Sequence, residues 1–279
     1  MITMHPPRRE TIFASTVSIC SGVLTAITIC AKRCKKRTST PLILKSCGAA
    51  KPDDYADGYT AEQRTQIITA VKNQLSPEDA QAIHFADILL QNIELGKYID
   101  DSGELNAQRD QMMAENTLWI LQQEQACGNS RIMISGHNNH IMQCENAGTP
   151  VLGSLLAEEL ESGYFAIGTD FYKSVCNLPK PYIGKRIAHT FYSHNPLAKA
   201  SKKCGFDVSF LDFSKVPEGS ALTEYTSNNI SMGSLGESYS ILMDFVPRSY
   251  RVRRIPQDAY DAMIFVANAT PIEIESLNK

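Results

Sequence analysis

The sequence predicts an α/β fold with a largely parallel or mixed sheet and a helical lobe ahead of it. Apolar residues recur at helical spacing in three successive stretches between residues 60 and 127. From residue 131 onward, short apolar runs alternate with further helical stretches. Strands that alternate with helices are typical of α/β sheets, and the uninterrupted helices before them are typical of a lobe.

The expected helices of the lobe are residues 60–75, 76–99 and 106–127. Thr60 is a suitable N-cap for the first. Ser76 is suited to cap the second and Pro77 to occupy its first position, because the fixed φ of proline matches a helix start. The third is expected to stop at Gly128, since glycine adopts the left-handed conformation of a helix end at the least cost.

The elements expected after the lobe are strands at residues 131–135, 164–171, 206–213 and 260–269, and helices at residues 149–163 and 195–205. The strands are short apolar runs, and the helix of residues 149–163 ends at a glycine, Gly163.

The bulk composition is that of a folded protein, with 43% hydrophobic and 20% charged residues among 279. A net charge of -3 disfavours nucleic acid as the main partner, because such binding needs a basic face. The 8 cysteines contain no Cys-x-x-Cys pair, which disfavours a zinc knuckle or a redox motif.

Residues 1–50 form a region of uncertain role, and residues 51–279 form a domain. Residues 48–58, which lie across this boundary, have the composition of a linker. Residues 11–31 carry no charge and are just long enough to span a bilayer as a helix. Three interpretations stay open: a membrane anchor, a signal-like segment, or an aberrant start. The positive block "KRCKKR" follows the segment, so a spanning helix would leave the rest of the chain in the cytoplasm. We expect a cytoplasmic protein, anchored to the membrane if residues 11–31 span it.

The stretch "RIMISGHNNHIMQ" places two of the chain's 6 histidines, His137 and His140, directly after an expected strand. Reactive residues collect in loops at the carboxyl ends of strands in parallel α/β sheets. An imidazole there can act as a general base or bind a metal, and the amides of Asn138 and Asn139 can orient it or donate to an oxyanion. The alternative is a polar loop whose side chains satisfy backbone groups. A metal pair has less support, because no third ligand stands at a telling spacing.

A second group of polar residues lies in "RDQMMAEN" within the third expected helix. Arg109 and Asn116 share one helical face with Met112 or Met113, and Asp110 lies on the adjoining face. This pattern fits a buried ionic site, but the spacing alone favours an ordinary amphipathic helix with a solvated edge.

Four blocks of the chain resemble the erythromycin esterase family in order and spacing: "RDQMMAENTLWIL", "GHNNHI", "PVLGSLLAEELESGYFAIG" and "YDAMIFVANATP". The resemblance implies an α/β core with helices on both faces of the sheet, helical lobes and a deep cleft. It implies hydrolysis of a small-molecule carboxylic ester, a macrolactone in the best-known members, by water that histidine and carboxylate groups activate. No cofactor or metal is implied.

The resemblance also assigns roles to residues. His137 and His140 match the family's His-Asn-x-His block, which implies a catalytic role with Asn138 and Asn139 beside them. Asn138 and Asn139 are expected to bind substrate or line the cleft. The further cleft-wall residues that the resemblance implies are Arg109, Asp110, Glu115 and Asn116.

The family's N-terminal Gly-Glu-x-x-His-Gly motif does not occur in this chain. We therefore expect an incomplete domain that lacks the family's N-terminal part. Loss of one positioned acid–base group costs on the order of 10²–10⁴ in rate. The alternatives to an active esterase are an inactive relic or ligand-binding protein and, with less support, a metal-dependent hydrolase that uses His137 and His140. The sequence carries no signal for an oligomeric state.

Overall fold

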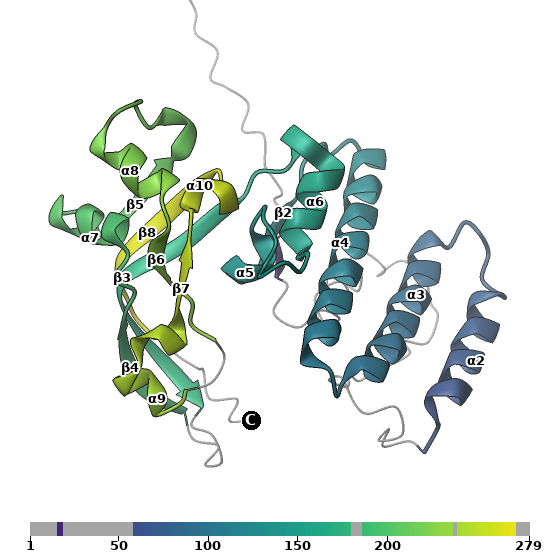
Figure 1. Cartoon of the computed structure of the whole chain (residues 1–279). Coiled ribbons are helices and arrows are strands. Elements are labelled where there is room, and N and C mark those ends of the chain that lie inside the picture. The colour runs from purple at the N-terminus through teal and green to yellow at the C-terminus, as the bar shows by residue number, and fades with distance from the viewer. Residues whose placement is uncertain (1–15, 19–57, 180–185, 237–238, 272–279) are drawn as a thin grey trace, which may run out of the picture. The chain divides into compact units, whose positions relative to one another are not determined.

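A computed structural model describes residues 16–18, 58–179, 186–236 and 239–271 (Figure 1). The chain forms two compact units, residues 1–136 (unit 1) and residues 137–279 (unit 2), and each is described by itself. The expected boundary at residue 50 lies outside the described residues. So does the apolar segment 11–31, apart from Thr16–Ser18. Within the described ranges, no helix combines the length and the apolar character that crossing a membrane requires.

Unit 1 is built on three helices that lie side by side in Figure 1: α2 (Ala61–Lys72), α3 (Ala80–Leu95) and α4 (Ser102–Ala126). The short 3-10 helix η1 (Gly96–Tyr98) joins α3 to α4. Thr60 caps α2 as expected: its hydroxyl accepts from the Gln63 N–H, and the Gln63 side chain accepts from the Thr60 N–H. The three expected helices of the lobe are therefore present.

The expected start of the second helix is wrong. Residues 76–79 close a turn of their own, in which the Asp79 N–H donates to the Ser76 carbonyl at 2.8 Å. Asp79 has a non-helical backbone, with ψ at 47°, so α3 begins only at Ala80. The helix α4 begins earlier than expected because Asp101 accepts from the N–H groups of Gly103 and Glu104.

The end of α4 and the strand that follows it were both expected. The helix ends just before Gly128, whose φ of 88° is the left-handed value foreseen for it. The expected strand 131–135 forms as β2 (Met133–Ser135) and pairs in parallel with β1 (Thr16–Ser18).

Unit 2 contains a four-stranded sheet in the order β4-β3-β8-β5. Its strands are β3 (Ile167–Pro179), β4 (Arg186–Tyr192), β5 (Val208–Asp212) and β8 (Ala262–Ala269). Only the central pair, β3 and β8, is parallel, so the sheet is mixed rather than largely parallel. Only residues 180–185 separate β3 from β4, too few for the crossover that a parallel neighbour needs, and these two strands pair antiparallel.

Unit 2 also contains a second strand pair, short helices and 3-10 turns. A second, antiparallel pair is formed by β6 (Ile230–Gly233) and β7 (Arg251–Arg254). The helices are α5 (Asn138–Ile141), α6 (Leu152–Leu160), α7 (Pro196–Lys203), α8 (Ala221–Ser227), α9 (Leu242–Phe245) and α10 (Pro256–Ala259). The 3-10 turns are η2 (Glu161–Gly163), η3 (Phe213–Lys215) and η4 (Pro247–Tyr250).

The core of unit 2 is deeply buried and two glycines allow its close packing. Met142, Leu152 and Met263 have no exposed surface. A Cβ on Gly153 would lie 2.3 Å from the Ile141 carbonyl carbon, so only glycine lets α6 pack against the end of α5. A Cβ on Gly168 would meet the Tyr260 ring at 2.8 Å.

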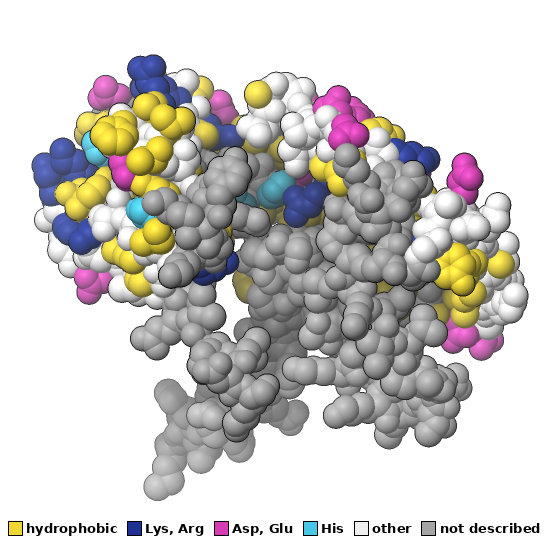
Figure 2. Space-filling model, turned by 90° about the horizontal axis from the view of Figure 1, so that it is seen from below, with side chains coloured by type: hydrophobic (Ala, Val, Ile, Leu, Met, Phe, Trp, Pro, Cys, Tyr) yellow, Lys and Arg dark blue, Asp and Glu magenta, His cyan; other side chains and the backbone are white. Residues whose placement is uncertain are grey.

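Apolar side chains also reach the surface of unit 2. On the edge strand β5, Val208 and Phe210 are 62% and 57% exposed. The space-filling view shows hydrophobic side chains lying among Lys and Arg side chains on one face of this unit (Figure 2).

Candidate functional site

The histidine segment forms the short helix α5, and His137 is its N-cap. The chain runs from β2 through Gly136 to His137, whose φ and ψ of -66° and 144° are extended. The Asn139 N–H donates to His137 Nδ1 at 3.2 Å, so the imidazole takes the place of the usual capping oxygen.

The second ring nitrogen of His137 is also engaged. Its Nε2 lies 3.1 Å from the carbonyl oxygen of Leu235. Because Nδ1 accepts a hydrogen bond, the proton of the neutral ring is on Nε2, which donates to this carbonyl. Burial lowers the pKa of His137, and the nearby charges of His140 and Arg254 lower it further, against the effect of the Leu235 carbonyl. His137 is therefore neutral at pH 7.

Asn138 binds the edge of strand β3 rather than an imidazole. Its Oδ1 accepts from the Thr169 N–H at 3.0 Å, and its Nδ2 donates to the Thr169 carbonyl at 2.6 Å. These two bonds are those that a neighbouring strand would make. The strand β4 pairs with β3 only from Lys173 onward, so the amide of Asn138 satisfies an edge that β4 does not reach.

Asn139 links the histidine segment to the β6–β7 pair. Its Nδ2 donates to the Ser234 hydroxyl at 3.4 Å, and its Oδ1 accepts from Arg254 Nη2 at 3.1 Å. The Arg254 guanidinium also donates to Met142 Sδ and, at 2.9 Å, to Asn146 Oδ1. Within the described residues Arg254 has no carboxylate partner, so its positive charge acts on the histidine segment.

Two tyrosine hydroxyls donate to carbonyls of α5. Tyr260 donates to the Asn138 carbonyl at 3.3 Å, and Tyr164 donates to the Ile141 carbonyl at 2.6 Å. Burial raises the pKa of both phenols, so both stay protonated donors across the physiological range. The helix carbonyls that have no partner within so short a helix are satisfied in this way.

His140 lies in the last turn of α5 and is half-buried. Its backbone N–H donates to the His137 carbonyl at 2.8 Å. The two histidines are therefore held on one rigid turn, and the charge of His140 disfavours a second charge on His137.

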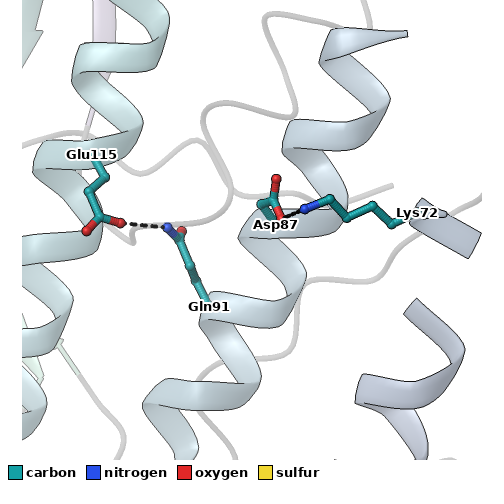
Figure 3. A network of polar contacts seen from close by, with 4 residues as sticks. All are labelled: Lys72, Asp87, Gln91 and Glu115. Carbon is teal, nitrogen blue, oxygen red and sulfur yellow. Dashed lines mark hydrogen bonds and ion pairs between the residues drawn. The ribbon is translucent and has the colours of Figure 1, made fainter. Parts of the chain in front are cut away.

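The other predicted site residues lie in unit 1, on α4. Glu115 and Asn116 both contact Gln91 of α3: Gln91 Nε2 donates to Glu115 Oε2 at 3.2 Å, and Asn116 Nδ2 donates to Gln91 Oε1 at 2.9 Å. Figure 3 shows Gln91 reaching Glu115 across the two helices. Asp110 is only 3% exposed, and Arg109 is half-buried. In unit 1, then, Glu115 and Asn116 help to join α3 to α4.

The sequence prediction missed Asp170, a buried carboxylate on β3. Its oxygens accept from the Phe171 N–H at 2.7 Å, from Asn195 Nδ2 at 2.8 Å and from the Gly233 N–H at 3.1 Å. Burial raises the pKa of Asp170, and these hydrogen bonds oppose the rise. A signal existed in the sequence, since "YFAIGTDF" carries one charged residue within an expected apolar strand.

The remaining described histidines lie elsewhere. His84 stacks on Trp119 and His189 on Tyr239, with ring centroids 3.8 and 3.5 Å apart. His194 is exposed in a turn with φ at 61°. No group of three or more His, Cys, Asp or Glu side chains in the described part of the chain could hold a metal ion.

Comparison with known proteins gives one family and three solved structures. The model of the erythromycin esterase family matches residues 32–269. A succinoglycan biosynthesis protein matches with a TM-score of 0.60 and 16% identity, over 75% of this chain and 50% of that one. A Bacillus cereus protein matches with a TM-score of 0.60 and 19% identity, over 77% and 52% of the two chains.

The third structure is a histidine-to-asparagine mutant of the erythromycin esterase EreC in its open conformation. It has a TM-score of 0.45 and 16% identity, over 75% of this chain and 50% of that one. The chain thus spans about half the length of the solved structures that it matches. No curated protein sequence matches it.

Proposed function

Because the chain belongs to the erythromycin esterase family, we propose that it is a hydrolase that cleaves a carboxylic ester with water activated by histidine and carboxylate groups. The observation that supports this most is that the helix α5 and its N-cap, residues 137–141, are fixed by contacts with distant segments. We call these residues the histidine turn. His137 and His140 share the helix α5, which is tied by side chains to β3, to residue 235 and to β7. Catalytic groups need such a preorganised frame.

The contacts of the turn suggest different roles for the two histidines. Both ring nitrogens of His137 are engaged, so we assign to it the task of holding the turn. We propose His140, the second histidine of the same family block, as the base that takes a proton from the attacking water. The Arg254 guanidinium, which lacks a carboxylate partner in the described residues, would stabilise negative charge that develops on the ester oxygen.

The roles of the α4 residues and the substrate come from the family. Arg109, Asp110, Glu115 and Asn116 are proposed to contribute to a cleft wall. The proposed substrate is a macrolactone-type small molecule. The proposed location of the protein is the cytoplasm.

A second candidate is a ligand-binding protein without turnover. It is favoured by the engagement of both His137 nitrogens and both ends of the Asn138 amide in bonds within the protein. A metal-dependent hydrolase that uses His137 and His140 is a third candidate.

The test is ester hydrolysis by the purified chain, with p-nitrophenyl esters and erythromycin as substrates. His140→Ala should lower kcat/KM by on the order of 10²–10⁴. His194→Ala is the control, because His194 is exposed and lies outside the turn. Equal activity of the wild type and His140→Ala would refute the assignment. Erythromycin binding by calorimetry without hydrolysis would favour the second candidate, and loss of activity with EDTA the third.

A further inference from the structure

The carboxylate of Asp170 is buried without a cation beside it in the described residues. It is 4% exposed and is held by two backbone N–H groups, the Asn195 amide and the Ser193 hydroxyl. A buried carboxylate is costly unless it is well hydrogen-bonded. Its hydrogen-bond partners therefore indicate its role.

One of these partners leads directly to the histidine turn. The Gly233 N–H donates to Asp170, and the next two residues contact the turn. The Ser234 hydroxyl accepts from Asn139, and the Leu235 carbonyl accepts from His137 Nε2. Gly233 is needed for this approach, since a Cβ there would lie 2.8 Å from Asp170 Oδ1.

Thr169, the residue before Asp170 on β3, contacts the turn directly. The backbone of Thr169 makes both hydrogen bonds to the Asn138 amide. Two consecutive residues of β3 thus set the position of the turn: Thr169 by direct contact and Asp170 through residues 233–235.

We propose that Asp170 is a positioning residue of the histidine turn, and that it keeps His137 in the Nε2–H tautomer by holding residues 233–235 in place. Its meaning for catalysis rests on the proposed function, whereas its effect on His137 does not. A displacement of about 1 Å in such a frame costs on the order of 10²-fold in rate.

The test compares two variants that disturb the same buried network. Asp170→Asn keeps the side chain's size and puts an NH₂ group among N–H donors. Gly233 and Asn195 both donate to Oδ2, so an NH₂ group at that position breaks both links, and one at the Oδ1 position faces the Phe171 N–H and forces the side chain to move. Asn195→Ala removes one donor and the N-cap of α7, and it leaves the bond from Gly233 to Asp170 in place. A purely structural role of Asp170 would give both variants the same effect on His137.

The first measurement is the ¹⁵N–¹H NMR spectrum of the histidine rings, which distinguishes the tautomers. We expect His137 to change from the Nε2–H form to a mixture in Asp170→Asn and to stay unchanged in Asn195→Ala. The Gly233 amide should exchange with solvent about tenfold faster in Asp170→Asn only. An unchanged tautomer in Asp170→Asn, or the same change in both variants, would overturn the proposal.

Gly233→Ala keeps the test decisive if Asp170→Asn does not fold. Its Cβ would lie 2.8 Å from Asp170 Oδ1, so residues 233–235 and the carboxylate must move apart, and the His137 tautomers should mix as well. An unchanged tautomer would again overturn the proposal.

Ester hydrolysis separates this proposal from the proposed function. In an active protein, Asp170→Asn should lower kcat by roughly 10- to 100-fold with little change in KM. If the wild type hydrolyses no ester, the proposed function fails, and the NMR comparison still decides the role of Asp170. If the wild type is active and the His137 tautomer does not respond, only the positioning role fails.

Discussion

The internal contacts that stabilise unit 1 differ from those that stabilise unit 2. In unit 1, α2 has no buried residue, and polar side chains link neighbouring helices, as Lys72 does with Asp87 and Gln91 with Glu115 (Figure 3). In unit 2, Met142, Leu152 and Met263 are fully buried, and side chains bind the backbone of distant segments.

This difference separates the two groups of predicted site residues. Glu115 and Asn116 have partners on an adjacent helix, within 25 residues along the chain. The histidine turn has partners much farther away: His137 contacts a carbonyl 98 residues on, and Asn138 is contacted by a tyrosine 122 residues on. A turn fixed by such distant partners is preorganised by the whole unit, whereas the α4 residues are fixed by local helix packing.

The largest effect is expected at Gly153, where α6 meets the end of α5. Gly153→Ala would force a Cβ against the backbone of Ile141 and should lower the free energy of unfolding of unit 2 by about 3 kcal/mol. Urea denaturation followed by circular dichroism measures the change, and hydrogen exchange in α5 and α6 places it in unit 2. Gly163→Ala is the matched control, because its Cβ would meet the Leu160 Cβ at an ordinary 3.7 Å and should cost less than about 0.5 kcal/mol. Equal costs would mean that the contact between α5 and α6 does not fix the turn.

A smaller difference in the free energy of unfolding is expected between the alanine variants of two asparagines, one in each unit. Asn138→Ala leaves the Thr169 N–H and carbonyl to solvent and should cost about 1.5 kcal/mol. Asn116→Ala loses one bond to Gln91 but also removes a buried Oδ1 that has no hydrogen-bond partner, so it should cost only about 0.5 kcal/mol. Denaturation of both variants gives the comparison. A larger cost for Asn116→Ala would contradict the view that long-range bonds dominate in unit 2.

The smallest effect concerns the pH dependence of unit 1. Burial lowers the pKa of His84, with Asp87 opposing, so the unfolded chain takes up a proton more readily than the folded one. The stability that the neutral ring contributes is therefore full above pH 6.5 and is lost as the pH falls below that value. Trp119, the single tryptophan, stacks on His84 and reports unfolding of unit 1 by its fluorescence.

His84→Phe supplies the control, since phenylalanine can stack on Trp119 but does not titrate. The variant should lose less stability than the wild type between pH 7 and pH 5. The same loss in both proteins would place the pH dependence of unit 1 on other groups.

Local signals in the sequence predicted the helices of unit 1, the strands β2, β3, β5 and β8, the helices α6 and α7, and the position of the histidine turn. Helical periodicity, the Thr60 cap and Gly128 predicted the helices of unit 1, because these signals act within a few residues. The family resemblance through the His-Asn-Asn-His block was confirmed by the family match. The assignment of catalytic roles to His137 and His140 stays a prediction.

Which groups meet depends on how the sheet and its connections assemble. Local patterns left open whether the sheet is largely parallel or mixed, and they gave no indication of β6 or β7, whose pairing depends on partners elsewhere in the chain. They assigned Asn138 to an imidazole or an oxyanion, and the structure places its amide on the edge of β3. The capping role of His137 was not foreseen, nor was the burial of Asp170, because strand order and burial are set when the sheet assembles. Hydrogen bonds between residues about a hundred positions apart leave no periodic signal in a sequence.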